Sequence, residues 1–270
     1  MFGLPLTALT IAMAITVFSP LGQLGPMADE APAGTGLALW QDFLTKYVDT
    51  TAADHINRIR YASVTLADRE GLESFLRFQQ SEKVSALTRA EQKAFWINLY
   101  NADIIAVTLR HYPLKSIMDI KGEGTKGKGG PFDDKSLVVE GDTLSLNDIE
   151  TRILRQGWRD NRIHFALNCA SIGCPNLAAQ AFTVDNIDRL MNKGAHAYLG
   201  VPRGATFEGP VLRLSSIFDW YREDFGGKSD AVVLGILANY ADPKMKTRLQ
   251  SYTGKIAYRY DWSLNDVSTR

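Results

Sequence analysis

The spacing of hydrophobic residues predicts a chain rich in helices. Apolar side chains recur at helical intervals over residues 37–48 and 67–80, and we expect an amphipathic helix in each stretch. A third helix should begin near Thr88, because Thr88 and Glu91 have the spacing of a capping box, and it should stop before Pro113. Further helices are expected over residues 145–156, 184–198, 217–224 and 231–240.

Strand patterns are fewer and shorter. Alternation around Gly141 predicts a hairpin, and residues 162–168, "RIHFALN", are the best candidate for a central strand. Residues 211–215 and 255–262 also have strand character. Because the helices do not alternate regularly with the strands, the fold class is α+β, with one mostly helical domain around a small β-sheet over residues 35–268.

The N-terminal stretch has the composition of an export signal. Residues 1–28 contain no charged side chain, and Leu6–Phe18 is a continuous apolar run. This run is too short to span a membrane as a helix, which takes about 20 apolar residues, but it fits the hydrophobic region of a signal peptide. We therefore expect cleavage between residues 22 and 33 and a periplasmic or secreted protein. A membrane would be contacted only through an uncleaved N-terminal segment.

Composition excludes one class of partner. Thirty Lys and Arg residues balance thirty Asp and Glu residues, so the net charge gives no electrostatic attraction to nucleic acid. The sequence identifies no other partner.

Both cysteines and one of the four histidines lie in "HFALNCASIGCP", residues 164–175. In an exported chain, Cys169 and Cys174 are expected to form a disulfide that closes a small loop. A metal site is disfavoured, because His164, Cys169 and Cys174 do not have a usual zinc spacing and no second Cys/His pair lies nearby in the sequence. We expect neither a metal nor a cofactor.

A catalytic thiol is the alternative interpretation of this stretch. On a strand, His164 and Cys169 would point to opposite faces, so a dyad requires the chain to turn sharply near residue 168. His111 and His196 are other candidate bases. Pro175 is favoured as the first residue of a helix, which would put Cys174 at a helix N-cap and lower the pKa of its thiol.

Polar residues in apolar surroundings suggest a binding pocket. Asn98 and Asn101 lie one turn apart on an otherwise apolar helix, and Asp219 lies in the aromatic segment "FDWY". A buried Asn needs hydrogen-bond partners, which a neighbouring loop or a polar ligand can supply. Asp219 is also a candidate for orienting a catalytic histidine.

Four long motifs carry a resemblance to a known family: "FWINLYNADIIAVTLRHYPLKSI", "FDDKSLVVEGDTLSLNDIETRILR", "RIHFALNCASIGCP" and "LRLSSIFDWYREDFGG". In this order they resemble domain-of-unknown-function family 547 over about residues 90–227. The resemblance implies no assigned activity. It does imply that the Asn98 and Asn101 helix face, His164, Cys169 and Cys174 belong to the pattern of the family.

Two functions remain open at this point. The favoured one is a binding or structural domain with a polar pocket near Asn98, Asn101 and the loop from Cys169 to Cys174. The alternative is a thiol-dependent hydrolase or acyl-transferase, in which Cys169 or Cys174 is the nucleophile and His164 the base.

Overall fold

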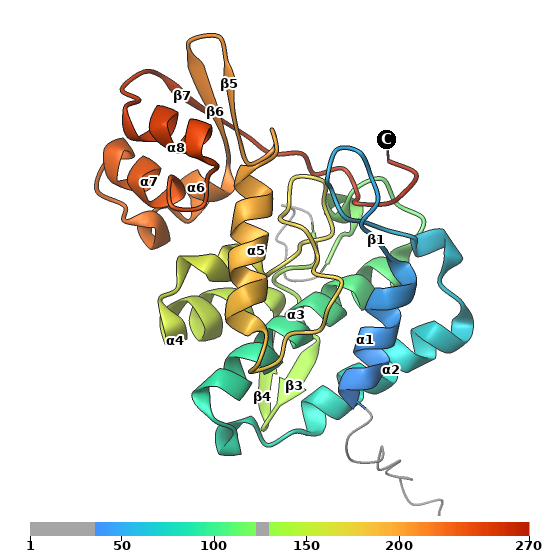
Figure 1. The fold of residues 1–270 in the computed structure, drawn as a ribbon. Helices are drawn as coiled ribbons and strands as arrows, with labels where there is room; N and C mark the ends of the chain where they lie inside the picture. Colours follow the sequence, from blue (N-terminus) through green and yellow to red (C-terminus); the bar gives the residue numbers. More distant parts are fainter. Residues whose placement is uncertain (1–35, 123–129, 270) are drawn as a thin grey trace, which may run out of the picture. The chain divides into compact units, whose positions relative to one another are not determined.

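The computed structural model describes residues 36–122 and 130–269, which form a single mostly helical α+β domain with small sheets, as the sequence predicted (Figure 1). The export signal expected over residues 1–28 lies outside the described residues.

Three helices build the first half of the domain: α1 (Gly36–Tyr47), α2 (Leu66–Ser81) and α3 (Arg89–His111). The capping box at the start of α3 is confirmed. The Thr88 hydroxyl accepts the Glu91 backbone N–H at 3.3 Å, and the Glu91 carboxylate accepts the Thr88 backbone N–H at 2.7 Å. Helix α3 is buried almost throughout from Lys93 to Leu109, so it forms the centre of the domain and not one of its faces.

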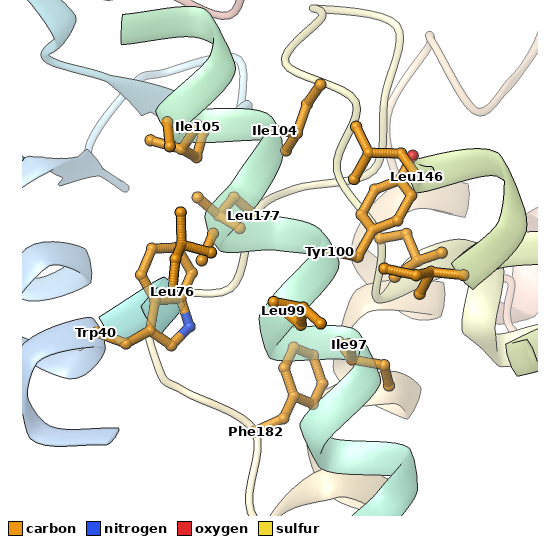
Figure 2. Close-up of a cluster of buried hydrophobic side chains, with 14 of the residues drawn as sticks. Trp40, Leu76, Ile97, Leu99, Tyr100, Ile104, Ile105, Leu146, Leu177 and Phe182 are labelled. Carbon is orange, nitrogen blue, oxygen red and sulfur yellow. The ribbon is translucent and has the colours of Figure 1, made fainter. Parts of the chain in front are cut away.

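The main hydrophobic core surrounds α3 (Figure 2). Trp40 from α1 and Leu76 from α2 pack on one side of the helix, and Leu146 lies on another side. Leu177 and Phe182, from a segment far along the chain, close the same core. The cysteine stretch and its downstream segment are therefore anchored on the most buried helix.

The middle of the domain consists of short elements. The predicted hairpin forms from β3 (Leu137–Val139) and β4 (Asp142–Leu144), with both turn residues, Glu140 and Gly141, at positive φ. The remaining elements are β1 (Val48–Asp49), β2 (Arg58–Ile59), the 3₁₀ turns η1 (Tyr61–Ser63), η2 (Val84–Ala86) and η3 (Ile117–Asp119), the π-helix η5 (Asp148–Arg155), α4 (Gln156–Trp158) and the 3₁₀ helix η6 (Asn161–Phe165).

The C-terminal part contains a second hydrophobic cluster, and Figure 1 shows its orange and red elements gathered together. These elements are α5 (Ile187–Leu199), β5 (Ala205–Glu208), β6 (Val211–Ser215), α6 (Ile217–Trp220), the 3₁₀ helix η7 (Arg222–Phe225), α7 (Asp230–Leu237), α8 (Pro243–Gln250) and β7 (Ile256–Arg259). Strand β6 pairs antiparallel with β5 and parallel with β7. The chain leaves this sheet at Tyr260 and returns to the cysteine stretch.

The predicted central strand over residues 162–168 is wrong. The stretch begins as the 3₁₀ helix η6, which Asp160 caps by accepting the Arg162 backbone N–H at 3.0 Å. The backbone then bonds locally, from Ile163 N to Asp160 O and from Ala166 N to Ile163 O. Residues 163–168 are all buried, so the apolar run reflects burial on every side and not the two faces of a strand.

Among the described residues, no helix is both long enough and apolar enough to cross a membrane.

Candidate functional site

A pocket of about 290 Å³ lies against the cysteine stretch. Its described lining combines aromatic side chains with a small group of ionisable ones. The lining residues are Tyr100, Gly130, Phe132, Asp133, Asn147, Glu150, His164, Leu167, Cys169, Cys174, Pro175, Ile217, Trp220, Tyr221, Tyr260 and Trp262. Residues from α3, η5, η6, α6 and the C-terminal segment therefore meet at one cavity.

Asparagines set the path of the chain into this pocket. Asn101 on α3 donates to the Ala166 carbonyl at 2.9 Å and accepts the Asn168 backbone N–H at 2.9 Å. Asn168 in turn accepts the Ala170 N–H and donates to the Pro175 carbonyl, which ties the two ends of the cysteine loop together. The chain turns sharply again at Ala170, directly after Cys169, where φ is +59°.

Asn98 bonds a neighbouring loop, which is one of the two kinds of partner that the sequence allowed. Its side chain accepts from Phe182 N at 2.9 Å and from the Trp40 indole, and it donates to the Phe182 carbonyl at 2.8 Å. These partners satisfy its amide, and Asn98 does not line the pocket. The side chains of both asparagines therefore hold backbone segments in place. The polar groups of the pocket come from other residues.

The C-terminal segment closes the loop from the other side. Backbone N–H groups of Ile172 and Gly173 donate to the carbonyls of Ser263 and Asp261, each at 2.8 Å. A side chain at Gly173 would have its Cβ 2.8 Å from the Asp261 backbone, so only glycine allows this close approach. The same segment delivers Tyr260 to the sulfur of Cys169.

The Cys169 thiol is at the centre of a hydrogen-bond network. Its Sγ lies 2.9 Å from the Tyr260 hydroxyl and 3.1 Å from the Ser171 hydroxyl, and these two hydroxyls are 3.0 Å apart. Burial opposes ionisation, but hydrogen bonds from Cys174, Ser171 and Tyr260 outweigh it and lower the pKa of the Cys169 thiol. Cys169 is partly exposed and lines the pocket, as a reactive thiol must.

Cys174 is the supporting member of the pair. Its Sγ accepts the Cys169 backbone N–H at 2.8 Å. Burial, together with the adjacent Cys169, raises the pKa of Cys174 well above its ordinary value, so this thiol stays protonated. Both cysteines are free in the structure, which therefore does not contain the expected disulfide.

The helix predicted to begin at Pro175 is also absent, so Cys174 is not at a helix N-cap. Side chains from elsewhere bond the backbone of this segment: Asn168 binds the Pro175 carbonyl, Asn57 the Leu177 carbonyl and Asn98 both polar groups of Phe182. These bonds replace the ones that a helix would make.

His164 lines the same pocket, but its ring nitrogens face carboxylates. Nε2 lies 2.6 Å from Asp224 Oδ2, and Nδ1 lies 3.7 Å from Glu150 Oε1. Burial opposes protonation, but hydrogen bonds to Asp224 and Glu150 outweigh it and raise the pKa of His164. Its ring stacks on Tyr221 with centroids 4.3 Å apart. The expected role of His164 as base for the thiol therefore does not match the orientation of its nitrogens.

Two carboxylates that sequence reasoning missed define this second network. Burial alone would raise the pKa of Asp224, but the hydrogen bonds with His164 and Arg155 together have the larger effect and lower it to about 2. Glu150 comes from the π-helix η5 and is buried at the pocket wall. The available sequence signal for Glu150 was an acidic residue directly after Ile149 and one turn before the apolar residues Ile153 and Leu154.

The other candidates are placed away from the pocket. Asp219, which was a candidate for orienting a histidine, is exposed. Asp224 lies beside His164 in its place. His111 and His196 are exposed and bond the carbonyls of Val107 and Tyr240. Across residues 36–122 and 130–269, no histidine bonds to either sulfur, and no group of three or more His, Cys, Asp or Glu side chains could hold a metal ion.

The fold and the pocket define an α+β protein with a free, partly exposed thiol in an aromatic cavity. Residues 84–199 match the family described as "Protein of unknown function, DUF547", so the chain carries a domain of this family over those residues. The matched range contains Glu150, His164 and both cysteines but ends before the segment around Asp219 that also carried the resemblance. No curated protein and no solved structure matches the chain.

Proposed function

We propose that the protein is a thiol-dependent acyl-transfer enzyme, a hydrolase or a transferase, with Cys169 as the nucleophile. The observation that carries the proposal is the environment of one sulfur: Cys169 Sγ lies within 3.1 Å of two hydroxyl groups, beside a protonated second thiol, at the wall of a pocket. Thiolate is the reacting form of cysteine, and donors that bind the anion favour it. A purely structural thiol needs no such donors.

The same donors suit the first chemical step. The thiolate of Cys169 attacks a substrate carbonyl, the carbon forms a bond to sulfur, and negative charge moves from sulfur to the carbonyl oxygen. The hydroxyls of Tyr260 and Ser171 are then the nearest donors for that oxygen. The carbonyl re-forms, the leaving group departs with a proton from solvent, and the acyl group remains on Cys169 as a thioester.

The second step needs a base, and Glu150 is the described pocket carboxylate best held for it. Its carboxylate is buried and lies 3.7 Å from the His164 ring, which Asp224 fixes from the other side. Glu150 accepts a proton from the attacking water or alcohol, the thioester carbon–sulfur bond breaks, and Cys169 returns as a thiolate. His164 acts here as a positioning residue for Glu150.

The test is acylation of the protein by p-nitrophenyl acetate. We expect a burst of p-nitrophenol and one acetyl group on the peptide that contains Cys169, absent from Cys169→Ala. Cys174→Ala is the matched control: it should keep the acetyl group on Cys169 but form it more slowly, because one donor to the thiolate is lost. Acetylation of Cys169 no faster than that of free cysteine at the same pH would overturn the proposal.

A further inference from the structure

The described lining of the pocket carries negative charge. Glu150 and Asp133 are carboxylates, Cys169 is a thiol with stabilised anion, and no described lining residue is Lys or Arg. His164 is the one described lining group that can be positive.

The charge of His164 is already matched. His164 lies between the carboxylates of Glu150 and Asp224, and Asp224 also bonds Arg155. When His164 is protonated, these two cations and two anions cancel. Neither His164 nor Arg155 is then left to balance the thiolate of Cys169. The exposed Asp133 adds a further negative charge to the pocket.

Aromatic rings form the rest of the wall. Trp220, Tyr260 and Trp262 contact one another, with ring centroids 4.6 to 5.7 Å apart. Trp220 lines the pocket and is 49% exposed, whereas Tyr260 and Trp262 are half-buried. Aromatic faces beside negative charge are the environment that binds ammonium groups, and tryptophan binds them best.

We propose that the pocket binds a substrate through an ammonium group held against Trp220, Tyr260 and Trp262 and next to Glu150. This inference rests on the proposed function, because it names the substrate class of the same site. The volume of about 290 Å³ suits a small organic cation or one ammonium-bearing end of a longer substrate. An anionic substrate would face the carboxylate of Asp133 and the thiolate of Cys169, and no described lining residue is a Lys or Arg that could pair with it.

The first test measures binding without the nucleophile. In Cys169→Ala, tryptophan fluorescence is titrated with choline and with its neutral isostere 3,3-dimethylbutan-1-ol. We expect choline to bind about tenfold more tightly than the alcohol, because the two differ only in the charge available for cation–π contact and carboxylate attraction. Propionate serves as the anionic probe and should not bind.

Matched variants locate the site. Trp220→Leu changes an exposed side chain, so folding should be retained, and it should remove most of the preference for choline. Glu150→Gln should weaken choline binding, whereas Glu223→Gln should not, because Glu223 makes the same charge change but does not line this pocket. The full protein is used throughout.

The second test uses the thiol as a reporter. Choline should slow the alkylation of Cys169 in the wild-type protein by iodoacetamide, and the neutral isostere should protect much less. If the alcohol binds and protects as well as choline, or if propionate binds better, the cation inference is overturned. If choline binds to Cys169→Ala but the wild-type thiol reacts no faster than free cysteine, the cation site stands and the nucleophile is rejected.

Discussion

Removing the hydroxyl of Tyr260 should make the Cys169 thiol harder to ionise. Tyr260→Phe deletes a donor that lies 2.9 Å from the sulfur and keeps the ring packed against Trp220 and Trp262. A hydrogen bond to a charged group contributes about 1.5–3 kcal/mol. Because one pKa unit corresponds to about 1.4 kcal/mol, the pKa of Cys169 should rise by roughly 1–2 units.

The direction follows from the charge of the acceptor. Tyr260 remains protonated, since burial and then the charge of Cys169 raise its pKa well above the ordinary value, so it stabilises the thiolate by donating. Losing that donor destabilises only the ionised form of Cys169. The remaining donors, Ser171 and Cys174, limit the rise.

The assay is the rate of iodoacetamide alkylation as a function of pH on folded, reduced protein. Peptide mass spectrometry assigns each adduct, so the slow, buried Cys174 does not blur the midpoint of Cys169. Tyr258→Phe is the matched control, because its hydroxyl contacts Arg222 and its side chain does not line the pocket. A midpoint in Tyr260→Phe that equals or falls below that of the wild type would refute the reasoning about the thiolate network.

Three further predictions follow from the described contacts. Asn101→Ala should lower the free energy of unfolding by about 1–3 kcal/mol and also slow alkylation of Cys169, whereas Asn98→Ala should affect stability alone. Urea unfolding measures the first effect and the rate of alkylation the second. Equal alkylation rates in the two variants would contradict the positioning role of Asn101. Asp224→Asn should lower the free energy of unfolding more at pH 6 than at pH 9. Because the folded state raises the pKa of His164, protonated His164 stabilises the fold fully below its ordinary pKa near 6.5, and this contribution is lost as the pH rises through the raised pKa. A larger effect of the substitution at pH 9 in urea unfolding would contradict this sign. Fusing residues 1–34 to a reporter that is active only outside the cytoplasm should give an active reporter, and a silent fusion would count against export.

Local patterns in the sequence predicted most helices, and they did so for local reasons. The capping box at Thr88 and the apolar spacing of α1 and α2 involve residues within a few turns of one another. The stretch over residues 162–168 failed because complete burial hides the difference between a strand and a 3₁₀ helix in one sequence. Helix α3 is buried as deeply, but the capping box at Thr88 and the proline at Pro113 marked its two ends in the sequence.

The site was only half predictable. Cys169, Cys174 and His164 stood out by their closeness in the sequence, and they do share one pocket. Their working partners come from far away: Asp224 is 60 residues from His164, and Tyr260 is 91 residues from Cys169. No periodicity links positions so distant, so the long-range contacts that orient the His164 ring and lower the pKa of the Cys169 thiol appear only in the folded chain.

Two stretches of the chain, far apart in the sequence, build the pocket around Cys169. Cys169, Cys174 and Glu150 lie inside the range that matches the family, whereas Trp220, Tyr260 and Trp262 lie beyond it. Changes in the later stretch therefore act on the pocket in two ways, through its aromatic wall and through the backbone bonds that Asp261 and Ser263 make to the cysteine loop.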